Sequence, residues 1–447
     1  MSLINKIIGK LHLSPTKEKV VRNIVWAVTG KVVTLLGGLL VGIFVARYLG
    51  PEQYGLMSYV MSYVALFQVL ASFGMDNIEI REESKTPEDK DKIIGTAFGL
   101  KLVFAVVTMG LIALTTWLFE ADSFTKWMII LYSISMIMNS FGVIRNYFTS
   151  LVWNEYIVKT EISRTLIGAG IKVVLLLLHA PLVWFIAATL FDTVLIAGGY
   201  LVSYRSKIDS IRKWQFDKDT ANYLIKESFP IWLSIIAVVI YQKIDQVIIG
   251  NMIDKEMVAY YAVAGVFINV INFIPIVLSN TITPILVKLY ANNSTEYKVK
   301  AQQFLNISVW IIIIICVFIS MTASPLVMYT YGAQYVPAIP ILQLAIFREI
   351  GHVQAQISGM LITIEHKQRL VALRNLIGCI LSISLNVVFI PKYGIMGAAV
   401  VSLISAFAAG YFAHALFPKY RSIFAMQTKS LMCGWKDLLK FKTIFKQ

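Results

Sequence analysis

Charged residues and cysteine are both scarce in this sequence. Charged residues make up 15% of the 447 positions, whereas a typical soluble domain has about 25%. The three cysteines, Cys316, Cys379 and Cys433, form no CxxC pair, so neither a disulfide framework nor a cysteine-based metal site is expected. Hydrophobic residues make up 57% of the chain. This balance is typical of an integral membrane protein and excludes an ordinary soluble domain.

Motifs of several other functional classes are also missing. No GxxxxGK[ST] stretch occurs, so the chain is not expected to hydrolyse ATP. No Ser/His/Asp arrangement is recognisable, and the predicted outer connectors are too short for the catalytic loop of a membrane polymerase or glycosyltransferase. The net charge of +15 is spread over short connectors, so a nucleic-acid partner is not expected. The sequence therefore predicts a protein that is not an enzyme, with no metal site and no cofactor.

Apolar runs close to 20 residues long recur along the chain, as expected for membrane-spanning helices. Transmembrane strands would instead alternate over about 10 residues. The first run is too long for a cleavable signal peptide and is expected to stay in the membrane. We predict an all-α polytopic membrane protein with twelve spans, at 23–47, 54–75, 93–118, 124–149, 156–178, 182–204, 228–251, 257–286, 303–325, 337–363, 370–390 and 394–417.

Lysine and arginine are distributed unevenly between the two sets of connectors. With the N-terminus in the cytoplasm, the outer connectors hold only Arg47, Lys126, Lys255 and Lys392, and the other connector cations lie inside. This asymmetry is that of the positive-inside rule, and a wrong number of spans would remove it. We therefore predict that both termini are cytoplasmic.

The longest central connector, RSKIDSIRKWQFDKDT, is polar and basic and separates six spans from six spans. An even number of spans gives both halves the same orientation in the membrane. Both chain ends carry apolar residues at helical spacing among lysines, which favours helices on the membrane surface over protein-binding helices. We predict two six-helix lobes around a central cationic cavity, in this order: basic interfacial segment 1–22, N-lobe 23–204, cytoplasmic linker 205–227, C-lobe 228–417 and basic amphipathic tail 418–447.

Charged side chains occur inside the predicted spans, where each costs at least about 2.5 kcal/mol in hydrocarbon. The basic ones outnumber the acidic ones, so complete pairing in salt bridges is not expected. At about 1.5 Å per residue, they also lie at a series of depths along the helices. We predict that they line a water-filled, cationic cavity that binds the substrate: Lys31, Arg47, Lys101, Arg145, Lys172, Lys243 and Arg348.

The tenth span has a polar face. Arg348, His352 and Gln356 recur every four residues and share one side of a helix, with Glu349 beside them. This spacing favours a face that lines the cavity, although a buried histidine with a packing role is the alternative for His352. Asp192, in the sixth span, is a further embedded acid, with either a structural role or a role in ion coupling.

Lys243 and Asp245 stand two residues apart within the seventh span. On a helix they point about 200° apart, so they cannot pair with each other. We predict that Lys243 faces the cavity and that Asp245 meets a basic residue on a neighbouring helix. The alternative for Asp245 is the coupling of transport to H⁺ or Na⁺.

Three stretches resemble a known family. ARYLGPEQYGLMSYVMS (46–62), followed by DNIEIRE (76–82), resembles the N-terminal signature of the polysaccharide transporter family. KIDQVIIGNMIDKEMVAYYAV (243–263) resembles the start of that family's second lobe, and PKYGIMGAAV (391–400) its link between the last two spans. These proteins are Wzx-type flippases within the multidrug/oligosaccharidyl-lipid/polysaccharide exporter (MOP) superfamily.

The resemblance implies an alternating-access flippase in the inner membrane of a bacterium. Its substrate would be an oligosaccharide on polyprenyl pyrophosphate, moved to the outer leaflet for O-antigen, capsule or a similar polymer. The polymerase and glycosyltransferases of the same pathway would be its protein partners. A cationic cavity suits a pyrophosphate, because Arg and Lys are natural partners of phosphate oxygens. The alternative is a cation-coupled multidrug extruder of the same superfamily, whose cavity would carry the opposite charge.

Overall fold

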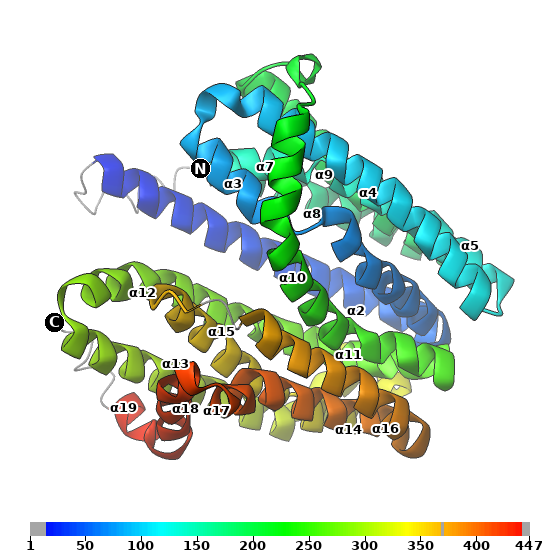
Figure 1. Ribbon diagram of the computed structural model, residues 1–447. Helices are drawn as coiled ribbons and strands as arrows, with labels where there is room; N and C mark the ends of the chain where they lie inside the picture. The colour runs from blue at the N-terminus through cyan, green and yellow to red at the C-terminus, as the bar shows by residue number, and fades with distance from the viewer. Residues whose placement is uncertain (1–14, 368–370, 440–447) are drawn as a thin grey trace. The chain divides into compact units, whose positions relative to one another are not determined.

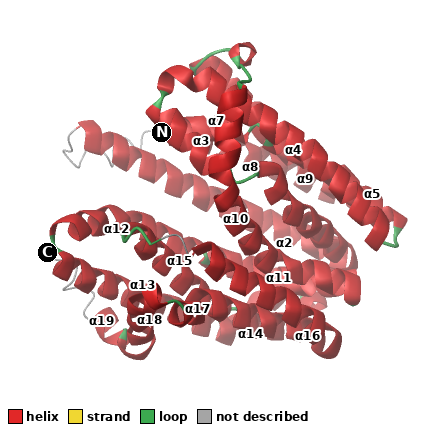
Figure 2. Cartoon of the chain, in the orientation of Figure 1, coloured by secondary structure: helices red, strands yellow, loops and turns green. Residues whose placement is uncertain are grey.

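The computed structural model describes residues 15–367 and 371–439, which are helices joined by short loops, with no strand in these ranges (Figures 1 and 2). The predicted all-α class is confirmed. The helices are α2 (Pro15–Ser72), α3 (Asp76–Lys85), α4 (Lys90–Phe119), α5 (Ser123–Ser133), α6 (Ser135–Asn139), α7 (Gly142–Ser150), α8 (Asn154–Leu177), α9 (Leu182–Lys207), α10 (Lys218–Met252), α11 (Lys255–Ile271), α12 (Phe273–Asn292), α13 (Ser294–Thr330), α14 (Ala338–Ala345), α15 (Arg348–Ile364), α16 (Val371–Phe407), α17 (Ala413–Leu416), α18 (Arg421–Cys433) and α19 (Trp435–Leu439). Shorter turns are the 3-10 helices Pro87–Asp89 (η1), Ile211–Lys213, Ala333–Tyr335 and Pro418–Tyr420, and the π-helix Ala408–Phe412 (η5).

Eight helical stretches of the described residues are long and apolar enough to cross a membrane. Two of them, Thr29–Lys85 and Val371–Leu416, each cover all or most of two predicted spans. The predicted spans at 156–178 and 337–363 also fall on helices, but α8 carries five charged residues and α14 and α15 are individually short. The chain is a multi-pass membrane protein. The predicted amphipathic segment at 3–11 lies outside the described residues.

Two glycines mark the turns inside the longest helices. Gly50 in α2 has φ +72° and Gly394 in α16 has φ +61°, values that glycine adopts without a Cβ clash. Pro51 follows Gly50 directly, and a proline suits the first position of a new helix because that position needs no N–H donor. Both breaks lie between consecutive predicted spans, in the motifs that carry the family resemblance.

The helices pack into two compact units. Unit 1 comprises Met1–Leu49 and Tyr63–Trp232, and unit 2 comprises Gly50–Ser62 and Leu233–Gln447. In unit 1, α8 packs along α9, and α3 packs against α7 and α4. In unit 2, α15 packs against α12, α13 and α16, while α18 and α19 pack on α13. The predicted lobe boundaries at 204 and 228 stay a prediction.

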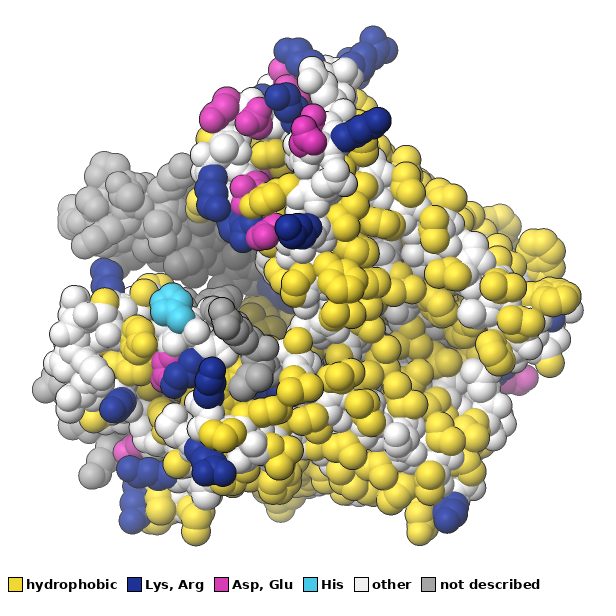
Figure 3. Space-filling view, in the orientation of Figure 1, with side chains coloured by type: hydrophobic (Ala, Val, Ile, Leu, Met, Phe, Trp, Pro, Cys, Tyr) yellow, Lys and Arg dark blue, Asp and Glu magenta, His cyan; other side chains and the backbone are white. Residues whose placement is uncertain are grey.

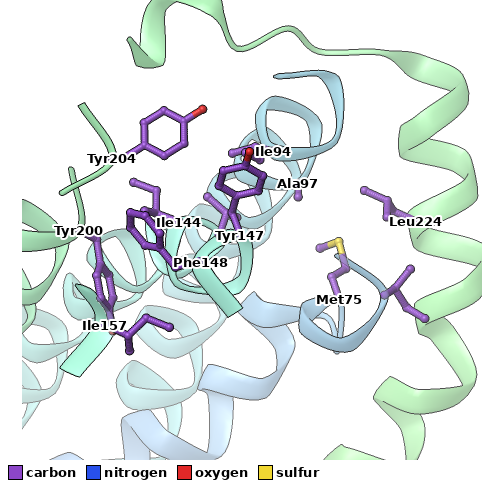
Figure 4. Packing of buried hydrophobic residues seen from close by; sticks show 12 residues of the cluster. Met75, Ile94, Ala97, Ile144, Tyr147, Phe148, Ile157, Tyr200, Tyr204 and Leu224 are labelled. Atoms are coloured by element: carbon purple, nitrogen blue, oxygen red, sulfur yellow. The ribbon is translucent and has the colours of Figure 1, made fainter. Parts of the chain in front are cut away.

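The core of unit 1 joins residues from α4, α7, α8, α9 and the start of α10. Figure 4 shows aromatic rings from α7 and α9 lying beside aliphatic side chains from α4 and α8. Tyr204, Phe148, Ile94, Ile144 and Leu224 are all fully buried in this cluster. The core fixes α4 and α7, which carry the charged residues described below.

The connector that precedes α10 is packed on unit 1 rather than extended away from it. Gln215 N donates to Asp91 O at 3.0 Å, and Asp217 N donates to Thr96 Oγ1 at 2.9 Å. Hydrogen bonds from the hydroxyl and the backbone N–H of Thr220 hold the pKa of the Asp217 carboxyl below its usual range. The carboxylate therefore stays ionised as pH falls to that lowered pKa, and continues to cap α10.

The surface of each unit has apolar and charged regions (Figure 3). In unit 1, hydrophobic side chains cover α4 and α5, and charged side chains gather around the connector before α10. In unit 2, hydrophobic side chains dominate over α14 and α16, and Lys and Arg gather over α18 and α19. In the tail helices, Trp435 and Leu439 are exposed among lysines, a composition that suits a membrane surface.

In unit 2, α15 approaches η5 through two glycines. A Cβ added to Gly351 would lie 2.7 Å from Ala406 C, and one added to Gly410 would overlap the Gly351 carbonyl. Small residues allow such close backbone approach between membrane helices. This contact sets where the polar face of α15 lies against α16.

Gly351→Ala should therefore destabilise unit 2 by about 1–3 kcal/mol, because the new methyl group overpacks a backbone contact. The measurement is the apparent Tm of the purified protein in detergent. Gly265→Ala in α11 is the matched control, since nothing lies within 4 Å of its added Cβ. Equal Tm values for the two variants would contradict the close packing of α15.

Candidate functional site

Lys101 on α4 lies in a buried charge cluster of unit 1. Its ammonium is 2.7 Å from Asp76 Oδ1 and 2.7 Å from Glu79 Oε1, and its side chain is 4% exposed. Asn146 of α7 donates from Nδ2 to Glu79 Oε2 at 2.6 Å. Lys101 lines a cavity of about 290 Å³ within unit 1. Lys101 is therefore paired, because α3, which lies beyond the predicted second span, brings two carboxylates to it. Its predicted contact with substrate stays a prediction.

Other predicted cavity cations of unit 1 also have acidic neighbours. Lys172 Nζ on α8 lies 2.6 Å from Asp192 Oδ2 on α9, which assigns Asp192 a structural partner. Arg145 Nε on α7 lies 3.6 Å from Glu161 Oε1, and the Arg145 side chain remains 51% exposed. The predicted excess of embedded positive charge is therefore smaller than the sequence indicates. The other two predicted cations of this unit, Lys31 and Arg47, are exposed on α2.

Asp192→Asn should destabilise unit 1 by up to about 3 kcal/mol, because Lys172 would be left largely buried without its carboxylate. The double variant with Lys172→Met and Asp192→Leu should recover much of this loss, since neither charge then remains. Thermal unfolding of the purified variants measures both effects. Glu155→Gln is the control, because its pair with Lys159 is exposed and such pairs contribute at most about 1 kcal/mol.

Asp245 in α10 is buried, with 1% of its surface exposed. Its Oδ2 accepts from the Tyr261 hydroxyl at 2.5 Å, and its Oδ1 accepts from Asn386 Nδ2 at 2.8 Å. Among residues 29–367 and 371–439, no basic side chain lies within ion-pair distance of it. The predicted pairing of Asp245 with a basic residue on a neighbouring helix is therefore not seen as an ion pair among these residues, although Arg348 of α15 lies close enough to interact with its charge. Neutral donors from α11 and α16 satisfy this carboxylate instead.

Lys243 and Arg348 lie near this carboxylate but differ in their partners. Arg348 Nε is 3.7 Å from Glu349 Oε1, and Asn272 Nδ2 donates to the same oxygen at 3.4 Å. Lys243 is partly buried, and no acidic side chain of residues 29–367 or 371–439 lies within ion-pair distance of it. Their contact with substrate stays a prediction.

Unit 2 contains a cavity of about 900 Å³. Its lining residues on α12 extend from just before the helix at Asn272 to Ala291, which is about 28 Å along the helix axis. His352 and Gln356 of α15 line it, whereas Arg348, one turn earlier, is not among its lining residues. The His352 ring stacks on Tyr241 at 6.0 Å between centroids. The polar face of α15 thus contributes two of its three predicted residues to this cavity.

Arg374 of α16 lines the same cavity and is 6% exposed. Its Nη1 donates to Ser358 Oγ at 3.3 Å and lies 3.3 Å from His414 Nε2. Its Nη2 donates to Asn375 Oδ1 at 3.3 Å. None of the described Asp or Glu residues lies within ion-pair distance. A buried guanidinium with only neutral partners keeps an unbalanced positive charge, which suits an anionic ligand.

Arg374 is not among the site residues predicted from the sequence. It lies inside the predicted span at 370–390, directly after Lys367 and Arg369, so it resembles the last residue of a basic connector. The available signal was the pair Arg374 and Asn375 at the start of a long apolar run. In the structure Asn375 also donates to Ser234 Oγ at 2.9 Å, which anchors this polar pair to α10.

The fold resembles solved transporter structures. A lipid II flippase, MurJ, in an inward closed conformation, matches with a TM-score of 0.67 and 16% identity over 95% of this chain and 94% of that chain. An inward-facing multidrug resistance MATE family transporter of the MOP superfamily matches with a TM-score of 0.66 and 16% identity over 89% and 96%. A MOP superfamily transporter from Pyrococcus furiosus Vc1 (DSM3638) matches with a TM-score of 0.57 and 15% identity over 92% and 97%. At these identities the likeness establishes the fold.

No curated protein sequence matches the chain. The family described as "Polysaccharide biosynthesis protein" matches residues 20–290, more than half of the 447 positions. The matched segment includes two of the three motifs that carry the resemblance described above. The similar solved structures are transporters and a flippase, and none is described as an enzyme. The chain belongs to the family described as "Polysaccharide biosynthesis protein".

Proposed function

We propose that this protein is a flippase that moves a polyprenyl-pyrophosphate-linked oligosaccharide from the cytoplasmic to the outer leaflet by alternating access. The observation that carries the proposal is Arg374, a buried cation without a carboxylate on the wall of the unit 2 cavity. A pyrophosphate offers several anionic oxygens, and the planar guanidinium fork binds such oxygens in pairs. Arg374 is our candidate for the pyrophosphate contact.

The rest of the cavity suits a sugar headgroup. Asn272, Asn280, Thr283 and Gln356 contribute hydrogen-bonding groups to its wall, which is otherwise largely apolar. Sugars are bound through such amide and hydroxyl groups. The lining extends about 28 Å along α12, which is long enough for several sugar units.

The predicted orientation agrees with loading from the cytoplasm. Under the positive-inside rule, the connectors around Lys288 and Lys367 face the cytoplasm. The cavity reaches Ala291 and His366 beside these connectors, and Arg374 lies one turn into α16. We propose that the pyrophosphate enters at this end, in the inner membrane of a bacterium, supplied by glycosyltransferases and passed on to a polymerase of the same pathway.

The second candidate is a cation-coupled multidrug extruder, because several similar structures are multidrug transporters. An extruder of cationic drugs needs acidic groups in its binding cavity. Arg374 has the opposite charge, and no Asp or Glu is among the lining residues of the unit 2 cavity. The Pyrococcus transporter is described by a binding pocket of reverse polarity that suggests a different function for that protein.

Ligand binding separates these two functions. Purified protein in nanodiscs should bind undecaprenyl pyrophosphate more tightly than undecaprenyl monophosphate, because the second phosphate adds contacts to the guanidinium. Rhodamine 6G, a cationic dye, should bind weakly. Tight binding of the dye without binding of the pyrophosphate would favour the extruder and contradict our proposal.

A further inference from the structure

The short helix α3 turns two carboxylates into the interior of unit 1. Glu79 and Glu83 are one helical turn apart and so share a face, and they are 0% and 1% exposed. α3 packs against α7 and α4 (Figure 1). Asp76 stands on the same helix one turn before Glu79, with a side chain that is 58% exposed.

The three carboxylates differ in their ion-pair and hydrogen-bond partners. Lys101 lies 2.7 Å from both Asp76 and Glu79, and Asn146 donates to both. Neither carboxylate oxygen of Glu83 has a hydrogen-bond partner, although both are fully buried. The Ser150 hydroxyl, which is close enough to Glu83 to stabilise its ionised form, donates to the Tyr147 carbonyl at 2.7 Å.

The charges of the cluster do not balance if every acid is ionised. Three carboxylates face one buried ammonium. Arg145, whose charge also acts on Asp76, is half exposed and lies beside Glu161. Burial of an ionised carboxylate without a partner is strongly unfavourable, and a carboxylic acid avoids that cost. Glu83 is the member of the cluster for which protonation loses no ion pair.

We propose that Glu83 is a proton-binding site of unit 1 and carries its proton at neutral pH. One proton binds one carboxylate oxygen of Glu83 and converts it into a neutral acid. Loss of that proton places a second negative charge one turn from Glu79, which would compete for Lys101. Protonation of Glu83 therefore controls the charge balance that holds α3 on α4.

The titratable groups around Glu83 come from every element packed against α3. They are Asp76, Glu79 and Glu82 on α3 itself, Asp91 and Lys101 on α4, Arg145 and Tyr147 on α7, and Glu88 and Asp89 in η1. Glu88 is exposed and Asp89 pairs with Lys92 at 3.5 Å, so η1 adds no buried charge. The cavity of about 290 Å³ that Asp76 and Lys101 line gives protons a route to the cluster.

The proposal deepens the proposed function, because it assigns the coupling ion as H⁺. The proton-binding site itself does not depend on the proposed function, whereas its consequence for transport rests on it. A proton bound before one half of the transport cycle and released after the other would link lipid movement to the proton gradient. In that case Glu83→Gln, which mimics the protonated state permanently, should flatten the pH profile of transport.

Infrared difference spectroscopy of the full-length protein in nanodiscs tests the site without any substrate. The spectrum of wild type minus Glu83→Gln at neutral pH should contain the carbonyl absorption of one protonated carboxylic acid. Glu88→Gln, which removes an exposed carboxylate three residues beyond α3, should leave that absorption unchanged. The proposal would be overturned if the spectrum of wild type minus Glu83→Gln lacked this carbonyl absorption. It would also be overturned if the Glu88→Gln protein lost the same absorption.

Glu83→Asp provides the test if Glu83→Gln does not fold. A protonated aspartate absorbs at a different frequency, so wild type minus Glu83→Asp should show a shifted band, and a spectrum without a shift would overturn the proposal. Because these spectra need no lipid, their failure leaves the flippase standing. Equally, a failure to bind undecaprenyl pyrophosphate leaves the proton site standing.

Discussion

Arg374→Gln should weaken the binding of undecaprenyl pyrophosphate by about 10- to 100-fold. A hydrogen bond to a charged group contributes about 1.5–3 kcal/mol, and each 1.4 kcal/mol is a factor of ten in affinity. Glutamine can still bond to Ser358 and Asn375 but carries no positive charge. Arg374→Lys should recover only part of the affinity, because the planar guanidinium fork is lost. Titration of each variant in nanodiscs measures the effect.

The same substitution separates a binding role from a structural one. An unpaired buried cation costs desolvation energy in the free protein, so Arg374→Gln should keep or raise the apparent Tm. Arg421→Gln, an exposed arginine of the same unit, should change neither affinity nor Tm. A large fall in Tm for Arg374→Gln with unchanged affinity would mean that Arg374 stabilises the fold and does not contact the ligand.

Asp245→Asn should destabilise unit 2 by about 1–3 kcal/mol. The carboxylate accepts hydrogen bonds from both Tyr261 and Asn386, whereas an asparagine offers one acceptor and turns a donor toward the other side chain. One buried donor then loses its partner, at the cost given. The apparent Tm of the purified variant measures this loss.

A second substitution identifies the cause. Tyr261→Phe removes one of the two donors to Asp245. In a double-mutant cycle, the loss of stability in the variant with both Asp245→Asn and Tyr261→Phe should therefore be smaller than the sum of the losses in the two single variants. If Asp245→Asn instead leaves the Tm unchanged and removes the pH or Na⁺ dependence of transport, Asp245 is a coupling site. That result would restore the alternative that the sequence left open.

The membrane fold could be predicted from sequence because hydrocarbon imposes a simple rule. A backbone in lipid must satisfy its own hydrogen bonds, so apolar runs of about 20 residues become helices. The turns were predictable too, since Gly50 with Pro51 and Gly394 with Pro391 interrupt the runs. The apolar runs do not show how the helices pack against one another, so the close backbone approach at Gly351 and Gly410 could not be predicted from them.

The candidate site was less predictable, because charge compensation depends on contacts between distant segments. Lys101 is neutralised by Asp76 and Glu79, which the span pattern assigned to a connector. Asp245 is satisfied by Tyr261 and Asn386, whose side chains carry no charge and give no signal in a count of acids and bases. A count of embedded charges therefore overestimates the free cations, as it did for Lys101.

The most direct test of the flippase is transport of a fluorescent oligosaccharide on undecaprenyl pyrophosphate in proteoliposomes. The protein is reconstituted at defined orientation, and the lipid that reaches the opposite leaflet is quantified by quenching with a membrane-impermeant reagent. We predict that wild type and Arg421→Gln translocate the lipid and that Arg374→Gln stays near the rate of protein-free vesicles. Translocation by Arg374→Gln at the wild-type rate would contradict the assignment of the unit 2 cavity, and no translocation by wild type would contradict the proposed function.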